Sequence, residues 1–180
     1  MDQIYTHPKR KTKVVFVQLG SPSEPTTKAL RKYLRKFLGD PRVVDINPWL
    51  WKIILNFFVL PFRPKKSAKL YARIWDGKSF PLITNTRDFT NNVREELKKI
   101  DPNGYVEVNH AFLLSPPYVN EVYDSWEDDL KKGIGATKLL VIPMFPQYSE
   151  STIASGIDAL AKELSKRVKI PTFEVITNFH

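Results

Sequence analysis

The 180-residue sequence predicts an α/β fold: a doubly wound parallel sheet covered by helices on both faces, in three α/β/α layers. Long segments with helical periodicity alternate with short apolar runs, which is the pattern of βαβ units. The runs are nearly continuous, as expected for strands that are buried on both faces. The expected strands are residues 13–19, 105–114, 137–144 and 172–176.

Turn signals bound the first strand and the first helix. Gly20, Ser21 and Pro22 end the strand, and Thr26 or Thr27 then caps a helix. The helix continues to residue 38 and is closed by the Gly-Asp-Pro of residues 39–41. Apolar side chains at helical spacing predict that its buried face consists of Leu30, Tyr33, Leu34 and Phe37.

The next region contains the most apolar window of the chain, residues 48–61, which has a proline at each end. A short helix is expected over residues 64–75, and a loop then leads into a longer helix over residues 81–100. The side chains expected on the inward side of the short helix are Leu70, Tyr71, Ile74 and Trp75.

The remaining elements repeat the strand–helix alternation. A turn at residues 115–117 opens a helix that ends at Lys132 and Gly133. The apolar run 139–145 is broken only by Pro143, and a helix over residues 151–168 follows it. The inward side chains of the helix before this run are expected to be Val119, Val122, Trp126 and Leu130.

Positive charge is concentrated in one segment. Residues 31–73 hold 11 Lys and Arg against two acids, a net charge of +9, which equals that of the whole chain. The apolar window lies inside this segment but is too short to span a bilayer, which takes about 20 apolar residues. An apolar, Trp-rich segment among cations is typical of a protein lying on an anionic membrane surface, and a buried helix is the alternative.

Several functional classes find no support in the sequence. There is no helix-turn-helix, zinc-ligand or RNP-type pattern, so a nucleic-acid partner is not expected. The turn after the first strand lacks the further glycines of a dinucleotide fingerprint, and no P-loop is present. The three histidines, His7, His110 and His180, have no metal-ligand spacing, and there is no cysteine. Taken by itself, the chain shows no catalytic constellation, metal site or tightly bound cofactor.

The loop at residues 146–150 is the most informative local feature. It follows a buried strand and precedes a helix, which is where open α/β sheets bind ligands. The unpaired N–H groups at the start of the new helix suit a carboxylate or a phosphate. Alternatively, Ser149, Ser151 and Thr152 only cap the helix.

Four segments together resemble the ferrochelatase family in order and spacing, and they cover almost the whole chain. They are residues 17–22 (VQLGSP), 31–45 (RKYLRKFLGDPRVVD), 63–75 (RPKKSAKLYARIW) and 145–152 (FPQYSEST). Ferrochelatases insert Fe²⁺ into a porphyrin held between two similar α/β domains. The resemblance implies a chelatase-like domain at residues 13–170, after a flexible leader at 1–12. Residues 171–180 would then begin a second, missing domain.

The resemblance also implies site residues. Leu19 would contact the macrocycle, Tyr71 and Ser79 would line the cleft, and Tyr148, Ser149 and Ser151 would lie in the strand-end loop. An apolar, basic lip at about residues 46–66 would rest on the membrane. Its apolar contacts would be Trp49, Trp51, Phe57 and Phe58. Porphyrin and Fe²⁺ would be substrates, and the protein would be cytoplasmic and peripherally attached to the membrane.

Two features limit what the resemblance implies. The family's catalytic Ser-x-His motif and its acidic partner match nothing in residues 1–180, so this chain is expected to be inactive alone and to require its own C-terminal domain. Leu113 and Leu114 stand where many members have Arg-Tyr. An uncovered interdomain surface would favour a homo-oligomer. The alternatives are a small homodimeric chelatase and a non-catalytic tetrapyrrole-binding or membrane-docking module.

Overall fold

The computed structural model describes residues 11–133 and 136–178. Its centre is a four-stranded sheet in the order β2-β1-β3-β4, in which every neighbouring pair is parallel. The strands are β1 (Thr12–Gln18), β2 (Val106–Phe112), β3 (Lys138–Pro143) and β4 (Thr172–Val175). All four expected strands are therefore present, and the predicted parallel α/β class is confirmed.

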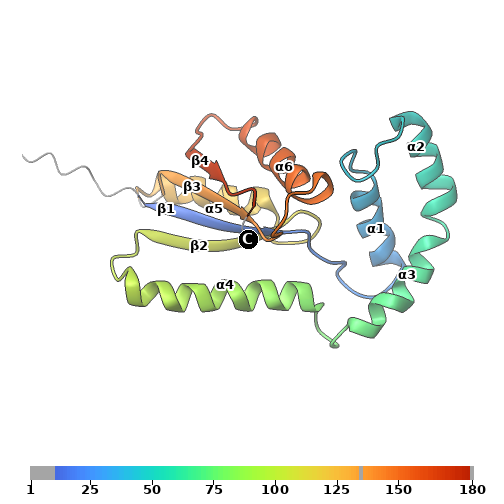
Figure 1. The fold of residues 1–180 in the computed structure, drawn as a ribbon, viewed down its shortest axis with the longest axis horizontal. Helices are drawn as coiled ribbons and strands as arrows, with labels where there is room; N and C mark the ends of the chain where they lie inside the picture. Colours follow the sequence, from blue (N-terminus) through green and yellow to red (C-terminus); the bar gives the residue numbers. More distant parts are fainter. Residues whose placement is uncertain (1–10, 134–135, 179–180) are drawn as a thin grey trace, which may run out of the picture.

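Helices cover both faces of the sheet (Figure 1). Helix α4 (Pro81–Ile100) lies along one face, whereas α5 (Val119–Lys131) and α6 (Ser155–Leu164) lie on the other. Alternate side chains of β1 point to opposite faces of the sheet. Val15 and Val17 pack with α5 and α6 on one face. On the other face the ring of Phe16 contacts that of Phe89 on α4, with 5.1 Å between the ring centroids. These contacts explain why β1 reads as a continuous apolar run.

A helical extension, residues 27–74, lies beyond the carboxyl ends of the strands (Figure 1). It contains α1 (Thr27–Leu38), α2 (Pro48–Ile54), the π-helical turn η1 (Leu55–Val59), α3 (Arg63–Tyr71) and the 3₁₀ turn η2 (Ala72–Ile74). The hydroxyl of Thr26 accepts the amide of Ala29 at 3.2 Å, as expected for the cap of α1. The extension has its own core, formed by Tyr33, Leu34, Leu38, Leu55 and Leu60.

The expected inward face of α3 is wrong in part. Leu70 and Ile74 are exposed, whereas Tyr71 and Trp75 are half-buried against Phe80. The buried residues of α3 are Pro64 and Ala68, because these small side chains let the helix approach α1 closely. The expectation followed the largest apolar side chains, whereas the side of the helix that is buried carries small ones.

The region around β3 also differs from expectation. Leu139 and Val141 are buried, but Leu140 and Ile142 on the opposite face are only half-buried because α4 packs mainly against β2. The following helix starts as a π-helical turn, η3 (Glu150–Ala154), and α6 ends at Leu164 rather than at residue 168.

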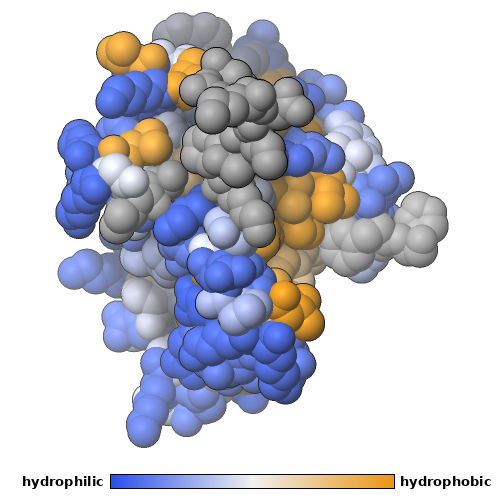
Figure 2. Space-filling model, turned by 90° about the vertical axis from the view of Figure 1, so that its left-hand side faces the viewer, coloured by the Kyte–Doolittle hydropathy of each residue, from blue (hydrophilic) through white to orange (hydrophobic). Residues whose placement is uncertain are grey.

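The surface at one end of the molecule is mainly polar. Figure 2 shows the end at the amino termini of the strands, which is largely hydrophilic over α4. The exposed ion pairs Glu95–Lys98 and Glu96–Lys99 lie on this helix.

Of the expected leader, residues 1–10 lie outside the described residues, and Thr12 already belongs to β1. Of the expected second-domain start, residues 172–175 form β4 and residues 179–180 lie outside the description.

Candidate functional site

The carboxyl ends of β1, β2 and β3 meet at one edge of the sheet. The strand order reverses between β1 and β3, and open parallel sheets bind ligands outside the carboxyl ends of the strands at such a point. Backbone bonds hold the loops together: Leu114 N–H donates to the Leu19 carbonyl at 3.0 Å, and Met144 N–H donates to Val17 at 2.8 Å. Leu19 therefore occupies the central loop of the candidate site.

Gly20 lets the β1 and β2 loops approach closely. Its φ of 93° lies in the region that favours glycine, and a Cβ there would overlap with the Ser115 hydroxyl. That hydroxyl accepts the Ser21 amide at 3.3 Å, which ties the two loops together. The glycine after the first strand is thus required by the close packing of the two loops.

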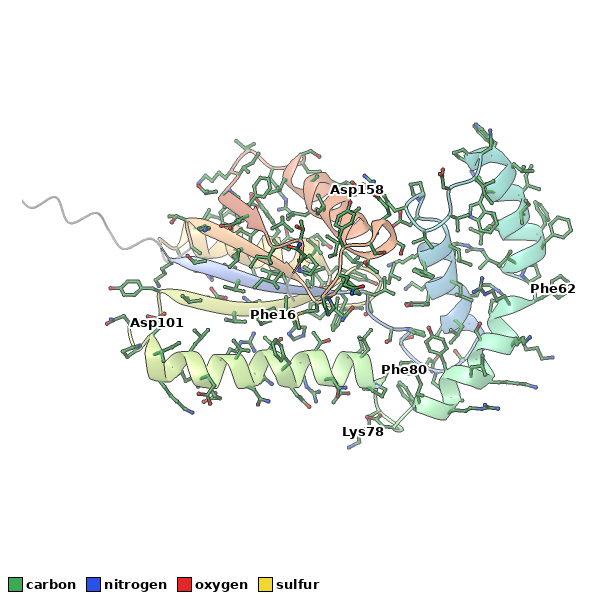
Figure 3. The ribbon with its side chains drawn as sticks, viewed as in Figure 1. Phe16, Phe62, Lys78, Phe80, Asp101 and Asp158 are labelled. Carbon is green, nitrogen blue, oxygen red and sulfur yellow. The ribbon has the colours of Figure 1, made fainter. Side chains whose placement is uncertain are left out.

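A cavity of about 350 Å³ opens beside this loop pair. Its walls come from the β1 and β2 loops, α1 and the segment that joins η2 to α4. Ser79 lines it, and Figure 3 shows Lys78 and Phe80 where α4 meets the helical extension. The apolar part of the wall includes Tyr33, Trp75, Phe80, Ile83 and Leu114.

Aromatic packing fixes the wall of this cavity. Phe80 is fully buried, with the rings of Tyr71 and Trp75 at 5.5 and 4.7 Å. The Tyr33 hydroxyl donates to the Gly20 carbonyl at 3.3 Å, and burial, reinforced by Tyr71, raises the pKa of Tyr33 above its usual range. Tyr33 thus links α1 to the loop after β1 as a hydrogen-bond donor.

Three lysines that were not expected from the sequence contribute to the lining of the cavity. They are Lys32 and Lys36 on α1 and Lys78 in the loop before α4. Lys36 Nζ donates to the Tyr118 hydroxyl at 3.0 Å. The Asp76 carboxylate accepts the Lys78 backbone amide at 2.7 Å and interacts electrostatically with Lys78, whereas no ion pair within the described residues involves Lys32. The i, i+4 spacing of Lys32 and Lys36 was the available signal, since it places both on one face of the helix.

The loop after β3 lies on the other side of β1. Tyr148 is 54% exposed, and its hydroxyl donates to Glu150 at 3.4 Å. The Ser149 carbonyl accepts the amides of residues 152–154, and its hydroxyl lies 3.1 Å from that of Ser151. Tyr148 thus lies at the surface, and the two serines are paired with each other at the start of η3.

The structure divides the six expected site residues into two groups. Ser79 lines the cavity and Tyr71 contacts its aromatic wall, while Tyr148, Ser149 and Ser151 lie on the β3 loop. Leu19, half-buried, belongs to the loop between the groups. The roles expected for these residues remain predictions.

The lip segment exposes an apolar surface on α2, η1 and the residues after them. This lip patch consists of Trp49, Leu50, Ile53, Phe57, Phe58 and Phe62, which are between 54% and 78% exposed. Trp51 belongs to the core instead, since it is half-buried and its Nε1–H donates to the Leu38 carbonyl at 2.7 Å. No helix within the described part of the chain is long and apolar enough to cross a membrane.

Metal-ligating chemistry is sparse in the described residues. They contain no group of three or more His, Cys, Asp or Glu side chains that could hold a metal ion. Burial, reinforced by Arg94 and then Arg87, lowers the pKa of His110 on β2, so this imidazole is neutral at pH 7. Leu113 and Leu114 bring no charge to the end of β2.

The family model for ferrochelatase matches residues 11–180. The chain belongs to the ferrochelatase family. It is 42% identical over 167 residues to a ferrochelatase from Idiomarina loihiensis, covering 93% of this chain and 44% of that protein. It is 37% identical over 172 residues to a coproporphyrin III ferrochelatase from Streptococcus mutans, covering 96% of this chain and 52% of that protein. The chain thus spans about half the length of the curated relatives it matches, and the fold is the expected chelatase-like α/β domain.

Proposed function

We propose that this chain is the N-terminal, porphyrin-binding domain of a ferrochelatase, the enzyme that inserts Fe²⁺ into a porphyrin. The observation that carries the proposal is the cavity at the carboxyl edge of the sheet, in a chain of this family. Porphyrin and Fe²⁺ are substrates in this proposal, and a C-terminal domain of the same protein closes the cleft. The chain alone is expected not to insert metal. Insertion needs a base that takes the pyrrole protons, and the family's catalytic Ser-x-His motif matches nothing in residues 1–180.

The chemistry of the cavity wall fits a porphyrin edge. A porphyrin is a flat apolar disc with carboxylates on its rim, so it needs an apolar wall and a few cations or hydroxyls. Trp75, Phe80 and Leu114 supply the apolar wall. Lys32, Lys78 and the Ser79 hydroxyl supply donors for the carboxylates.

Replacing Lys32 and Lys78 together with alanine is expected to weaken porphyrin binding by about tenfold or more, because a hydrogen bond to a charged group is worth about 1.5–3 kcal/mol. The dissociation constant would be measured by porphyrin fluorescence. A Lys98→Ala/Lys99→Ala variant is the matched control, because these lysines lie at the far end of α4.

Unchanged affinity in the cavity variant would contradict the role of these lysines. Absence of binding by the unmodified chain would contradict porphyrin binding itself. Zinc insertion by the purified chain, clearly above the protein-free rate, would favour a homodimeric chelatase over a domain that is inactive alone.

A second part of the proposal is peripheral attachment to anionic membranes through the lip patch. Six large apolar side chains are exposed there, next to Lys52, Arg63, Lys65 and Lys66. Apolar contact plus basic residues is the combination that binds an anionic lipid surface. This arrangement would place the cavity near a membrane-derived substrate.

Replacing Trp49, Phe57 and Phe58 with alanine is expected to reduce binding to anionic vesicles at least about tenfold, since each buried aromatic side chain contributes about 1.5–3 kcal/mol. Binding should also weaken as salt rises from low concentration to 0.1 M, where charges are screened within about 10 Å. Vesicle co-flotation measures both effects. Ile100→Ala is the control, because Ile100 is also exposed but lies outside the patch. Equal binding to neutral and anionic vesicles would refute the electrostatic part.

A further inference from the structure

A cluster of ion pairs joins the segment after α1 to the start of α6. The Arg42 guanidinium donates from Nε to Asp158 Oδ2 at 2.7 Å and from Nη2 to Asp158 Oδ1 at 3.1 Å. Its Nη1 donates to Glu150 Oε2 at 2.8 Å, so one side chain bridges η3 and α6. The Ser155 hydroxyl donates to Asp40, which adds a second link two residues away. Figure 3 shows Asp158 on the side of α6 that faces the helical extension.

On one side, this cluster reaches the strand-end loop. Glu150 is the first residue of η3, and its other carboxylate oxygen accepts the Tyr148 hydroxyl at 3.4 Å. A continuous chain of polar contacts therefore runs from Arg42 through Glu150 to Tyr148. Arg42 and Tyr148 thus bond the two oxygens of the same carboxylate.

On the other side, Arg42 is fixed to the helical extension. Its backbone amide donates to Asp40 Oδ1 at 2.8 Å, and the amides of Val43 and Val44 donate to the Asp40 carbonyl at 3.0 and 3.1 Å. Val43 and Val44 pack against the core of the extension. Arg42 is thus anchored to the same body that carries α1, α2 and the cavity lysines of α1.

The ion pairs of this cluster are expected to contribute little to the global stability of the protein. The side chains of Arg42, Glu150 and Asp158 are 41%, 62% and 53% exposed, and exposed ion pairs contribute little to stability. The three bonds from one planar group do, however, fix a geometry that a point charge cannot fix. The hydrogen bond from Arg42 also lowers the pKa of Asp158.

We propose that Arg42 is a positioning residue that holds the loop of residues 148–151 against the helical extension. Through Glu150 it sets the spacing between the two groups of candidate site residues, the cavity side and the β3-loop side. This inference rests on the proposed porphyrin function. The Asp-Pro-Arg at residues 40–42 therefore has two roles: it follows the end of α1, and it sets the distance between the cavity and the loop after β3.

The test compares three variants of the whole chain: Arg42→Ala, Arg42→Lys and Arg167→Ala. Arg167 is the control, because it also pairs with carboxylates, those of Asp124, Glu127 and Glu163, but on the α5 side of α6. Amide hydrogen exchange at residues 152–154 reports on the loop, and exchange in β1 reports on global stability. Porphyrin fluorescence reports on affinity.

We expect Arg42→Ala to speed exchange at residues 152–154 but not in β1, and to weaken porphyrin binding by about 2- to 30-fold, the range for residues that act without touching the ligand. Arg42→Lys should fall between the wild type and Arg42→Ala, and Arg167→Ala should leave affinity unchanged. Unchanged loop exchange in Arg42→Ala would overturn the inference. Faster loop exchange with unchanged affinity would overturn it as well. If the wild type binds no porphyrin, the proposed function fails, and loop exchange alone still decides whether Arg42 positions the loop.

Discussion

Replacing Phe80 with alanine is expected to lower the free energy of unfolding by about 3–5 kcal/mol, the usual range for a buried phenylalanine. Phe80 is 1% exposed and sits where α4 meets the helical extension, against the rings of Tyr71 and Trp75 (Figure 3). Its removal leaves a void between the extension and α4, in the wall of the cavity. Porphyrin binding should weaken together with stability. Urea denaturation measures the first effect and porphyrin fluorescence the second.

Phe62→Ala is the matched control for this substitution. Phe62 is 73% exposed and lies on the outer side of the helical extension (Figure 3). Its removal should change the free energy of unfolding by no more than about 0.5 kcal/mol, as is usual for surface positions. Similar losses in the two variants would mean that Phe80 does not anchor the extension.

Gly20→Ala is expected to destabilise the protein by about 2–4 kcal/mol, since a left-handed backbone costs about 1–3 kcal/mol for other residues and overpacking adds a similar amount. The φ of 93° is unfavourable for alanine, and the new methyl would overlap with Ser115 Oγ and lie 3.0 Å from Phe112 Cβ. The β1 and β2 loops must then separate, which distorts the cavity beside them. The free energy of unfolding, measured by chemical denaturation, and the affinity for porphyrin should therefore both decrease.

Two further variants separate strain from overlap. Gly77 has the same φ of 93°, but a Cβ there meets nothing within 4 Å, so Gly77→Ala should show the backbone cost alone, about 1–2 kcal/mol. Adding Ser115→Ala to Gly20→Ala removes the hydroxyl that overlaps and should restore part of the lost stability. A Gly20 variant no worse than the Gly77 variant would show that the loops can separate without cost.

Residue pattern located the candidate site only in part. The loop that contains Tyr148 could be placed from its pattern alone, because it follows a buried strand, whereas Leu19 and Ser79 were expected only from the family resemblance. Each of these residues lies at the carboxyl edge of the sheet or beside it. The cavity lysines were missed because exposed lysines on a helix or in a loop look like ordinary solvated surface. The bridging role of Arg42 was missed because Glu150 and Asp158 lie more than 100 residues away in the chain.

The sequence by itself determined the fold class and the family. Buried parallel strands must be apolar on both faces, and helix ends need capping and turn residues, so both leave local patterns that can be read directly. Only the tertiary structure decided which face of α3 is buried, where the cavity lies and which loops touch. Those features depend on contacts between distant segments: Ala68 against α1, Gly20 against Ser115, and Arg42 against Asp158. Local periodicity carries no information about such contacts, because it describes a residue's own element and not the surface packed against it.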